Sequence, residues 1–407
     1  QLRPYLAFRN IHDLTHQNPE ACTEGSAIQG GMSFKMYPNF PDLNLQLSDA
    51  RAKYTAAPAW NLNVTYSDEY RRGFDCREDL LVPGCFETTL KPGGSVVFSA
   101  SVMQEDPTEF KRKFTSGVKA AGEITGYRDQ LRRCADSLIT EHNGRKRIEA
   151  GYSWMYTGLL RESLLALPGL ALCGLDSART FEEILDNLIA DQQERLFRRT
   201  TQVEAPLLLA SCLQSYISYG ADPKAVWKKY GIILRGVLES YLPGERAEVS
   251  MQPNGLLWEQ KDGVALSWMN AYAGGHPVTE RAGYQVETNA FWYNAICFAV
   301  DMESKYGSKK STFVSKWSGI RDLVRANYQK VFWNPEYGCL ADYVDNSGQN
   351  MDIRPNQLAS IWCDYSPIDE DLAPSILRVV DNELVTSRGI RTLSPRDSKY
   401  KGVYEGT

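Results

Sequence analysis

The sequence has few histidines and no close cysteine pair. It contains four His and nine Cys in 407 residues, and no HxxH, HExxH or CxxC pattern brings metal ligands together. Several cysteines lie in apolar runs such as "LALCGL", where a free thiol packs as a small hydrophobic group. An odd number of cysteines in a long chain favours a reducing compartment over a disulfide scaffold. We therefore expect no metal site, no cofactor and a cytoplasmic location.

The chain also lacks a long apolar run and an excess of basic residues. No run is long enough to span a bilayer, and no signal-peptide pattern opens the sequence. With 45 Lys and Arg against 50 Asp and Glu, the formal net charge is -5. This balance gives no general attraction to nucleic acid or to an anionic membrane, and the longest basic cluster, Lys111–Lys113, is short. Neither nucleic acid nor membrane is expected as a partner.

Two regions of the chain differ in pattern. Residues 1–106 carry short alternating or β-branched runs, such as "SFKMYPNF" and "WNLNVTYS", between turn residues. These runs predict a partial antiparallel β-sandwich. A linker over 107–121 then leads to a region, 122–407, with helical periodicity. The chain is therefore predicted to be an α+β protein with more than one domain.

Apolar residues at three- and four-residue spacing predict nine helices in the second region. The predicted helices span 122–140, 159–173, 177–197, 203–219, 223–241, 286–305, 310–332, 355–364 and 369–385. Except after residue 197, long loops alternate with short ones, so the long loops gather at one end. This order is typical of an (α/α)6-type helical toroid, with function expected at the long-loop end. An α-solenoid is the alternative, although no fixed-period repeat supports it.

The long loops collect aromatic, acidic and amide side chains. The richest stretch, 265–295, reads "ALSWMNAYAGGHPVTERAGYQVETNAFWYNA". Aromatic rings stack on the C–H faces of sugars, and planar polar groups bind hydroxyls in pairs, so this composition predicts a carbohydrate cleft. The candidate binding residues are Trp154, Arg161, Glu162, Glu204, Trp268, His276, Arg281, Asn356 and Gln357.

Several of these residues have an ordinary structural alternative. Glu204 follows Thr201 at the spacing of a capping box. Glu287 lies in the first turn of a predicted helix, where its charge complements the helix dipole. Arg161 and Glu162 are also consistent with a surface ion pair. The sequence leaves both interpretations of each residue open.

The stretch 265–295 resembles a motif of the bacterial-type glycogen debranching enzyme (amylo-α-1,6-glucosidase) family. The family pattern T-W-M-D…P-V-T-P-R-x-G…V-E-x-N-A-L-W-Y-N-A-L is similar to "SWMN…GHPVTERAGYQVETNAFWYNA". Further similar segments follow the family order: "YLAFRNIHDLTHQN", "RRGFDCREDLLVPGCFE", "AGYSWM", "LPGL", "DIRPNQL" and "GIRTLSPRDSKYKGVYEG". The resemblance implies a β-sandwich followed by an (α/α)6 barrel. It also implies an inverting hydrolase that removes α-1,6-linked glucose at branch points of glycogen or limit dextrin.

The resemblance also carries an expectation about both ends of the chain. Family members have more β-sandwich before the segment that matches Gln1 and further helices after the one that matches Thr407. The toroid is therefore expected to be incomplete at its C-terminus, with the catalytic base of the family beyond Thr407. The oligomeric state is left open.

The sequence departs from the family pattern where chemistry is expected. Asn270 stands at the position of the general-acid Asp, and a carboxamide has no titratable proton near neutrality. Glu162 and Glu204 replace the Asp of the family's W-G-R-D and V-D-A-P-L-W motifs. Two alternatives follow. Either Glu259 in "LLWEQKDG" or Glu287 supplies the proton, or the chain is a catalytically impaired glucan-binding or regulatory relative.

Overall fold

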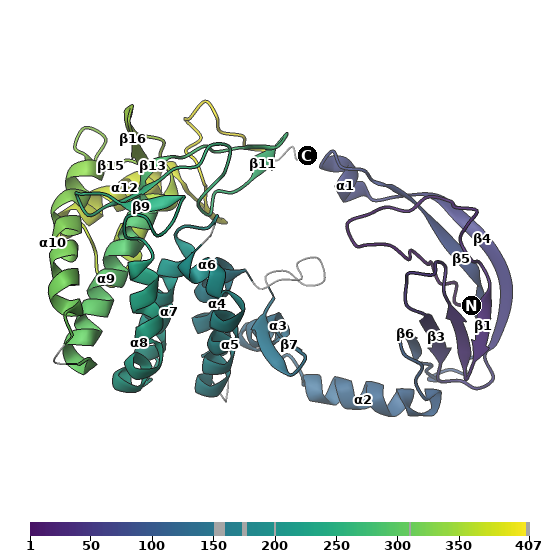
Figure 1. The fold of residues 1–407 in the computed structure, drawn as a ribbon. Coiled ribbons are helices and arrows are strands. Elements are labelled where there is room, and N and C mark those ends of the chain that lie inside the picture. Colours follow the sequence, from purple (N-terminus) through teal and green to yellow (C-terminus); the bar gives the residue numbers. More distant parts are fainter. Residues whose placement is uncertain (150–158, 173–176, 199–200, 309–310, 404–407) are drawn as a thin grey trace. The chain divides into compact units, whose positions relative to one another are not determined.

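The computed structural model describes residues 1–149, 159–172, 177–198, 201–308 and 311–403 (Figure 1). The described residues form two compact units, 1–130 and 131–403. The segment predicted to be a linker contains helix α2 (Phe110–Ala121), which follows a short 3-10 turn capped by Asp106. Its apolar residues Phe110, Phe114 and Val118 are four apart, a spacing typical of a helix, although no helix was predicted in this segment. The domain limits at 106 and 122 stay predictions.

The first unit consists of antiparallel sheets, as predicted. Strands β1 (Gly25–Ile28), β2 (Gly31–Phe34), β3 (Leu43–Leu47) and β6 (Phe98–Ser101) form a four-stranded sheet in that order. The long strands β4 (Lys53–Thr65) and β5 (Arg77–Glu87) pair separately, with the one-turn helix α1 (Ser67–Arg71) between them. The core of this unit is made of Leu6, Ala21, Phe34, Met36, Leu45, Leu47, Leu81 and Phe86.

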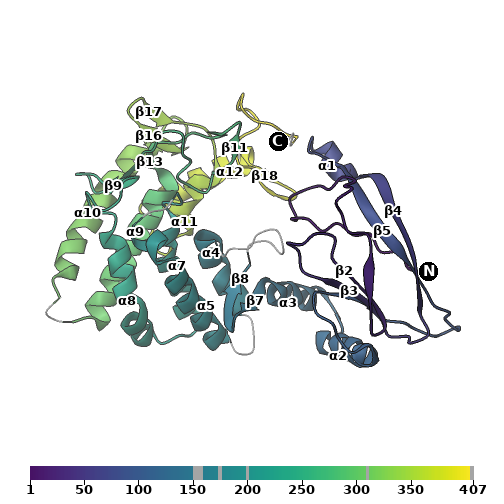
Figure 2. The ribbon, with the colours of Figure 1, turned by 45° about the vertical axis from the view of Figure 1, so that its right-hand side comes forward.

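The second unit is a double layer of antiparallel helices. Helices α4 (Leu160–Ala171), α7 (Leu208–Ser218), α9 (Val286–Tyr306) and α11 (Ala359–Trp362) contact one another in chain order, and we call them the inner helices. The returning helices are α5 (Ser177–Asp191), α8 (Pro223–Glu239), α10 (Phe313–Phe332) and α12 (Ala373–Glu383). Figures 1 and 2 both show α4, α7 and α9 side by side. The predicted helices are confirmed, with shifted ends.

The shifted ends have local causes. The predicted helix 122–140 shortens to α3 (Tyr127–Leu138), because its last residues join the hairpin β7 (Ile139–His142)–β8 (Arg145–Ile148). The predicted helix 177–197 breaks at Gln192, after which α6 (Gln193–Phe197) begins. Prolines open the 3-10 turns η2 (Ala205–Leu207) and η3 (Pro355–Leu358), which precede α7 and α11. Another 3-10 turn, η4 (Glu370–Leu372), precedes α12.

The long loops fold into a sheet of short strands. In space their order is β17 (Gly348–Asn350), β16 (Tyr343–Asp345), β13 (Gly283–Gln285), β10 (Leu257–Glu259) and β9 (Val249–Met251). Three hairpins with strands of two residues form separate two-stranded sheets. They are β11 (Tyr272–Ala273)–β12 (His276–Pro277), β14 (Trp333–Asn334)–β15 (Cys339–Leu340) and β18 (Val385–Thr386)–β19 (Gly389–Ile390). Figure 1 places β9, β13 and β16 at one end of the helical layers.

None of the described helices is long and apolar enough to cross a membrane.

Candidate functional site

The first turns of the inner helices carry the polar residues of the candidate site. Arg161 and Glu162 lie in the first turn of α4, and Glu204 directly precedes η2, which leads into α7. Glu287 is the second residue of α9, and Asn356 is the second residue of η3, which leads into α11. The unpaired N–H groups and partial positive charge at helix starts favour carboxylates there. The fold thus concentrates charged and amide side chains at one end of the inner layer.

Arg281 holds two carboxylates in a buried ion-pair network. Its Nη1 and Nη2 donate to the two carboxylate oxygens of Glu287 at 2.5 and 2.7 Å, and its Nε lies 2.9 Å from Oδ2 of Asp342. The side chains of all three residues are at most 3% exposed. Burial alone would lower the pKa of Arg281, but the charges of Asp342 and Glu287 raise it above its ordinary value. Arg281 therefore stays charged, and it forms a fork-shaped pair with Glu287.

A glycine allows this network to form. Gly283 has a φ of +99°, and a Cβ at that position would lie 2.3 Å from the main-chain oxygen of Val344. Strand β13 can therefore lie tightly against β16, which directly follows Asp342. The close approach brings Arg281, two residues before Gly283, to Asp342.

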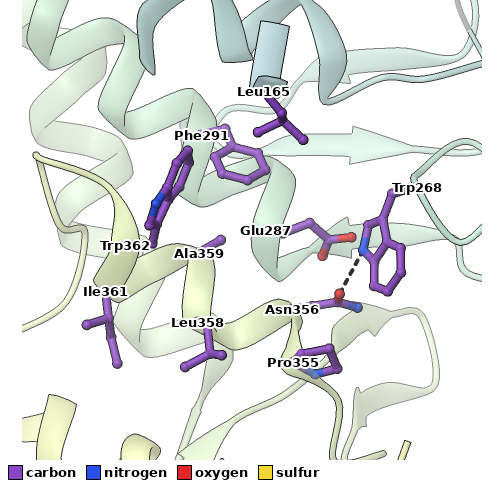
Figure 3. Close-up of a pocket in the computed structure, with 10 residues that line it drawn as sticks. All are labelled: Leu165, Trp268, Glu287, Phe291, Pro355, Asn356, Leu358, Ala359, Ile361 and Trp362. Carbon is purple, nitrogen blue, oxygen red and sulfur yellow. Dashed lines mark hydrogen bonds between the residues drawn. The ribbon is translucent and has the colours of Figure 1, made fainter. Parts of the chain in front are cut away.

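Asn356 connects Asp342 to an aromatic side chain. The Asn356 Nδ2 donates to Oδ1 of Asp342 at 2.7 Å, and the Asn356 Oδ1 accepts from the indole Nε1 of Trp268 at 2.8 Å (Figure 3). The Nε of Arg354 lies 3.7 Å from Asp342 Oδ2. Asp342 therefore contacts the side chains of two arginines, Arg281 and Arg354, and the amide of Asn356.

A cavity of about 490 Å³ opens between the starts of α4, α9 and α11. Its polar end is formed by Glu287, Asn356 and Trp268, whereas the remaining lining side chains are apolar (Figure 3). The apolar lining residues are Leu165, Phe291, Pro355, Leu358, Ala359, Ile361 and Trp362. The volume is in the range of sites that bind small molecules.

Arg161 forms a second buried pair beside the cavity. Its Nη1 lies 3.0 Å from Oε1 of Glu204, and its Nη2 donates to Glu162 at 2.6 Å. Burial raises the pKa of Glu204 to about 7, although the Arg161 charge opposes the shift. The first helical turn begins at Ala205 and not directly after Thr201, and the Glu204 carboxylate bonds to Arg161 through Oε1 while its Oε2 has no hydrogen-bond partner among the described residues. The capping-box alternative for Glu204 is therefore wrong, because its carboxylate turns toward Arg161.

Glu259 is the most deeply buried acid near the site. It ends β10, is fully buried, and neither carboxylate oxygen has an ion-pair or well-formed hydrogen-bond partner among the described residues. Burial raises its pKa well above the ordinary value, the nearby hydroxyl of Thr288 opposes this, and the charges of Glu287 and Glu204 add to it. Burial therefore favours the neutral form of Glu259, and this residue does not line the cavity. No group of His, Cys, Asp or Glu in the described ranges is arranged to hold a metal ion.

Comparison with protein-family models identifies the family of the chain. A family model described as amylo-α-1,6-glucosidase matches residues 132–407, which is more than half of the chain. The chain belongs to this family. A model of the N-terminal part of glycogen debranching enzyme matches residues 1–97. The resemblance seen in the sequence is confirmed for both units.

Solved structures of glycoside hydrolases share the fold of this amylo-α-1,6-glucosidase family member. A bacterial glucoamylase complexed with acarbose superposes with a TM-score of 0.50 at 10% identity, covering 88% of this chain and 59% of that one. This match confirms the predicted fold class, antiparallel sheets followed by a helical body of the (α/α)6 toroid type. The chain spans only that 59% of the glucoamylase.

Two rhamnosidases are more weakly similar. The rhamnose-bound enzyme from Klebsiella oxytoca gives a TM-score of 0.42 at 9% identity, covering 88% of this chain and 72% of that one. The GH78 family enzyme of Bacillus sp. GL1 gives 0.49 at 12% identity, covering 89% of this chain and 39% of that one. No curated protein sequence matches the chain.

Besides Glu259, Arg281 and Arg161 with its two acidic partners, three further predicted site residues, Asn270, His276 and Gln357, do not line the cavity of this family member. Asn270 is exposed and follows Met269, whose sulfur accepts from Asn356 at 3.5 Å. His276 is exposed on the β11–β12 hairpin. Gln357 is buried, accepts from the Leu340 N–H and donates to the Arg354 carbonyl, so its amide fixes main chain instead of facing the cavity. Trp154 lies outside the described residues.

Asp342 and most of the apolar lining residues were not predicted as site residues, although helical spacing indicates some of the lining residues. Leu165 lies four residues after Arg161 on α4, and Phe291 lies four residues after Glu287 on α9. Side chains four apart share a helix face, so both were accessible to prediction. Likewise Pro355, Leu358, Ala359 and Trp362 follow an i, i+3, i+4, i+7 pattern on one helical face. Asp342 has no such signal.

Proposed function

We propose that the chain binds the α-1,6-linked terminal glucose of a branched α-glucan, such as glycogen or limit dextrin, in this cavity. In this proposal it hydrolyses the branch linkage with inversion. The observation that carries the proposal is the polar end of the cavity, where Arg281 holds Glu287 beside Trp268 in a member of the amylo-α-1,6-glucosidase family. A bacterial origin and a cytoplasmic location stay predictions.

The charges of the cavity favour a neutral polyol over an anion. Glu287 lines the cavity, whereas the Arg281 cation beneath it already pairs with Glu287 and Asp342. Among the described residues, the lining therefore offers a ligand no unpaired cation, and its exposed surface is almost wholly apolar. Hydroxyl groups can donate to Glu287 and to the Asn356 carbonyl, while the rings of Trp268 and Phe291 offer flat surfaces to sugar C–H groups. A phosphate or carboxylate ligand would find no cation to pair with among the described lining residues.

None of the three predicted catalytic residues is placed to donate a proton in the proposed reaction. Both carboxylate oxygens of Glu287 are paired with Arg281, and Glu259 has no surface on the cavity. Asn270 cannot protonate a leaving oxygen. This last observation favours a second candidate function, a glucan-binding relative with impaired catalysis. The first function predicts slow but measurable hydrolysis, and the second predicts binding alone.

One assay separates these functions. The substrate is a maltooligosaccharide that carries a single α-1,6-linked glucosyl branch. The assay measures the amount of glucose released and which anomer of it forms first. Slow release of β-glucose, the inverted product of an α-linkage, supports the hydrolase. Binding of the oligosaccharide without release supports the impaired relative. If the protein neither binds nor cleaves the oligosaccharide, both functions are wrong.

A further inference from the structure

We infer that Asp342 is the positioning residue for the polar end of the cavity. It orients Glu287 through Arg281 and orients Trp268 through Asn356, although it does not line the cavity itself. The inference rests on the proposed function only for the identity of the ligand, because the two connections belong to the protein alone.

The first connection fixes the carboxylate of Glu287. The Nη2 of Arg281 donates to the Asp342 main-chain oxygen at 3.0 Å and to Asp342 Oδ1 at 3.3 Å, and its Nε lies 2.9 Å from Asp342 Oδ2 as an ion-pair contact without hydrogen-bond geometry. These contacts set the plane of the guanidinium, since it is rigid and flat. The fork formed by Nη1 and Nη2 then sets the plane of the Glu287 carboxylate. Without the Asp342 charge, Arg281 would keep only one of its two anionic partners.

The second connection fixes the direction of an amide. A carboxamide can turn by half a rotation and exchange its donor and acceptor ends. The carboxylate oxygen Oδ1 of Asp342 can pair with the NH2 end of the Asn356 amide but not with its carbonyl end. It therefore selects the orientation in which the Asn356 Nδ2 faces it. The Asn356 carbonyl must then face the Trp268 indole N–H, which it accepts at 2.8 Å. Asp342 thereby determines where the Trp268 ring lies in the cavity wall.

The main chain around Asp342 is itself held firmly. Its N–H donates to the Asn350 carbonyl at 2.9 Å, and its carbonyl accepts from the Val286 N–H at 3.2 Å. Asp342 therefore ties the β16–β17 hairpin to the first residue of α9, next to Glu287. With its side chain 1% exposed, it can act on a ligand only through Arg281 and Asn356.

The test compares Asp342→Asn with the exchange variant Asp342→Asn/Asn356→Asp. In the exchange variant the new amide at 342 can donate to the new carboxylate at 356, whose other oxygen can still accept from Trp268. The control is Asp345→Asn, which changes an acid on the same hairpin. Among the described residues, the Asp345 side chain accepts a hydrogen bond only from the Ser347 N–H. Two readouts are used: the indole N–H resonance of Trp268 without ligand, assigned with Trp268→Phe, and the Kd of the singly branched oligosaccharide.

Asp342→Asn is expected to shift the Trp268 indole resonance, speed its hydrogen exchange and weaken oligosaccharide binding at least tenfold. The exchange variant is expected to restore the indole resonance but only part of the affinity, because the negative charge beside Arg281 stays absent, and Asp345→Asn is expected to change neither. An unchanged indole resonance in folded Asp342→Asn would overturn the inference. If Asp342→Asn does not fold, a folded exchange variant without the wild-type resonance would overturn it. Failure of the wild type to bind the oligosaccharide would instead count against the proposed function, since the resonance does not depend on sugar.

Discussion

Replacement of Asn270 by Asp is expected to raise the rate of α-1,6-glucosidic hydrolysis by about 10²–10⁴-fold. A carboxyl group can give a proton to the leaving glycosidic oxygen, and a carboxamide cannot. Asn270 is exposed directly after Trp268 and Met269, and Asn356 contacts both of those residues. A carboxyl group at 270 would therefore stand in solvent close to a fixed wall of the cavity. The gain is expected in kcat, because the wall that binds the sugar is unchanged.

The measurement is glucose release from the singly branched oligosaccharide by the wild type and by Asn270→Asp. Asn270→Ser is the matched control, since it changes the same side chain without adding a titratable proton, and its rate should equal that of the wild type. The rate of Asn270→Asp should fall as pH rises through the pKa of the new acid. An Asn270→Asp variant that binds the oligosaccharide as the wild type does, yet cleaves it no faster, would show that position 270 does not supply the proton.

Replacement of Arg281 by Met is expected to lower the free energy of unfolding by about 3–5 kcal/mol. The cause is the loss of the cation that, within the described part of the chain, alone pairs with Glu287, and this loss leaves Glu287 and Asp342 buried with less compensation. Met retains most of the apolar stem of Arg281, so the change tests the charge more than the volume. Urea unfolding measures it.

A surface ion pair provides the comparison. Arg396 lies 3.2 Å from Glu383 with its side chain 81% exposed, so Arg396→Met should cost no more than about 1 kcal/mol. The loss in Arg281→Met should also shrink at mildly acidic pH, because burial raises the pKa of Asp342 and protonation of that carboxyl removes an unpaired charge. Equal losses in the two variants, or a loss independent of pH, would mean that the Arg281 network contributes little to stability.

The helical layers could be predicted because their signal is local. Helices such as α8, α9 and α10 carry apolar residues at helical spacing over many turns, and the pattern alone gives their positions to within a few residues. The five-stranded sheet could not be predicted, since its strands are three residues long and too short for an alternating pattern. Such strands are defined by their partners in space.

The same limit explains which site residues were found. Trp268, Arg281 and Glu287 lie in one continuous motif, and the structure brings them to one network or cavity. The exposure of Glu259 depends on strand geometry, because β10 turns Trp258 to one face and Glu259 to the other, which is buried. Asp342 is one of several acids in its loop, and only the pairing of β16 with β13 selects it as the partner of Arg281. These features depend on register, which the sequence does not reveal.

The most direct measurement of the central claim, that the cavity at the starts of the inner helices binds a glucan branch, is a calorimetric titration. The singly branched oligosaccharide is titrated into the wild type, Trp268→Ala and Trp258→Ala. Trp268 lines the cavity, whereas Trp258 packs against Tyr284 on the five-stranded sheet and does not line it. We predict that Trp268→Ala weakens binding by at least about tenfold, or about 1.4 kcal/mol, while Trp258→Ala leaves it unchanged. Unchanged affinity in Trp268→Ala, or loss only in Trp258→Ala, would contradict the assignment of this cavity as the glucan site.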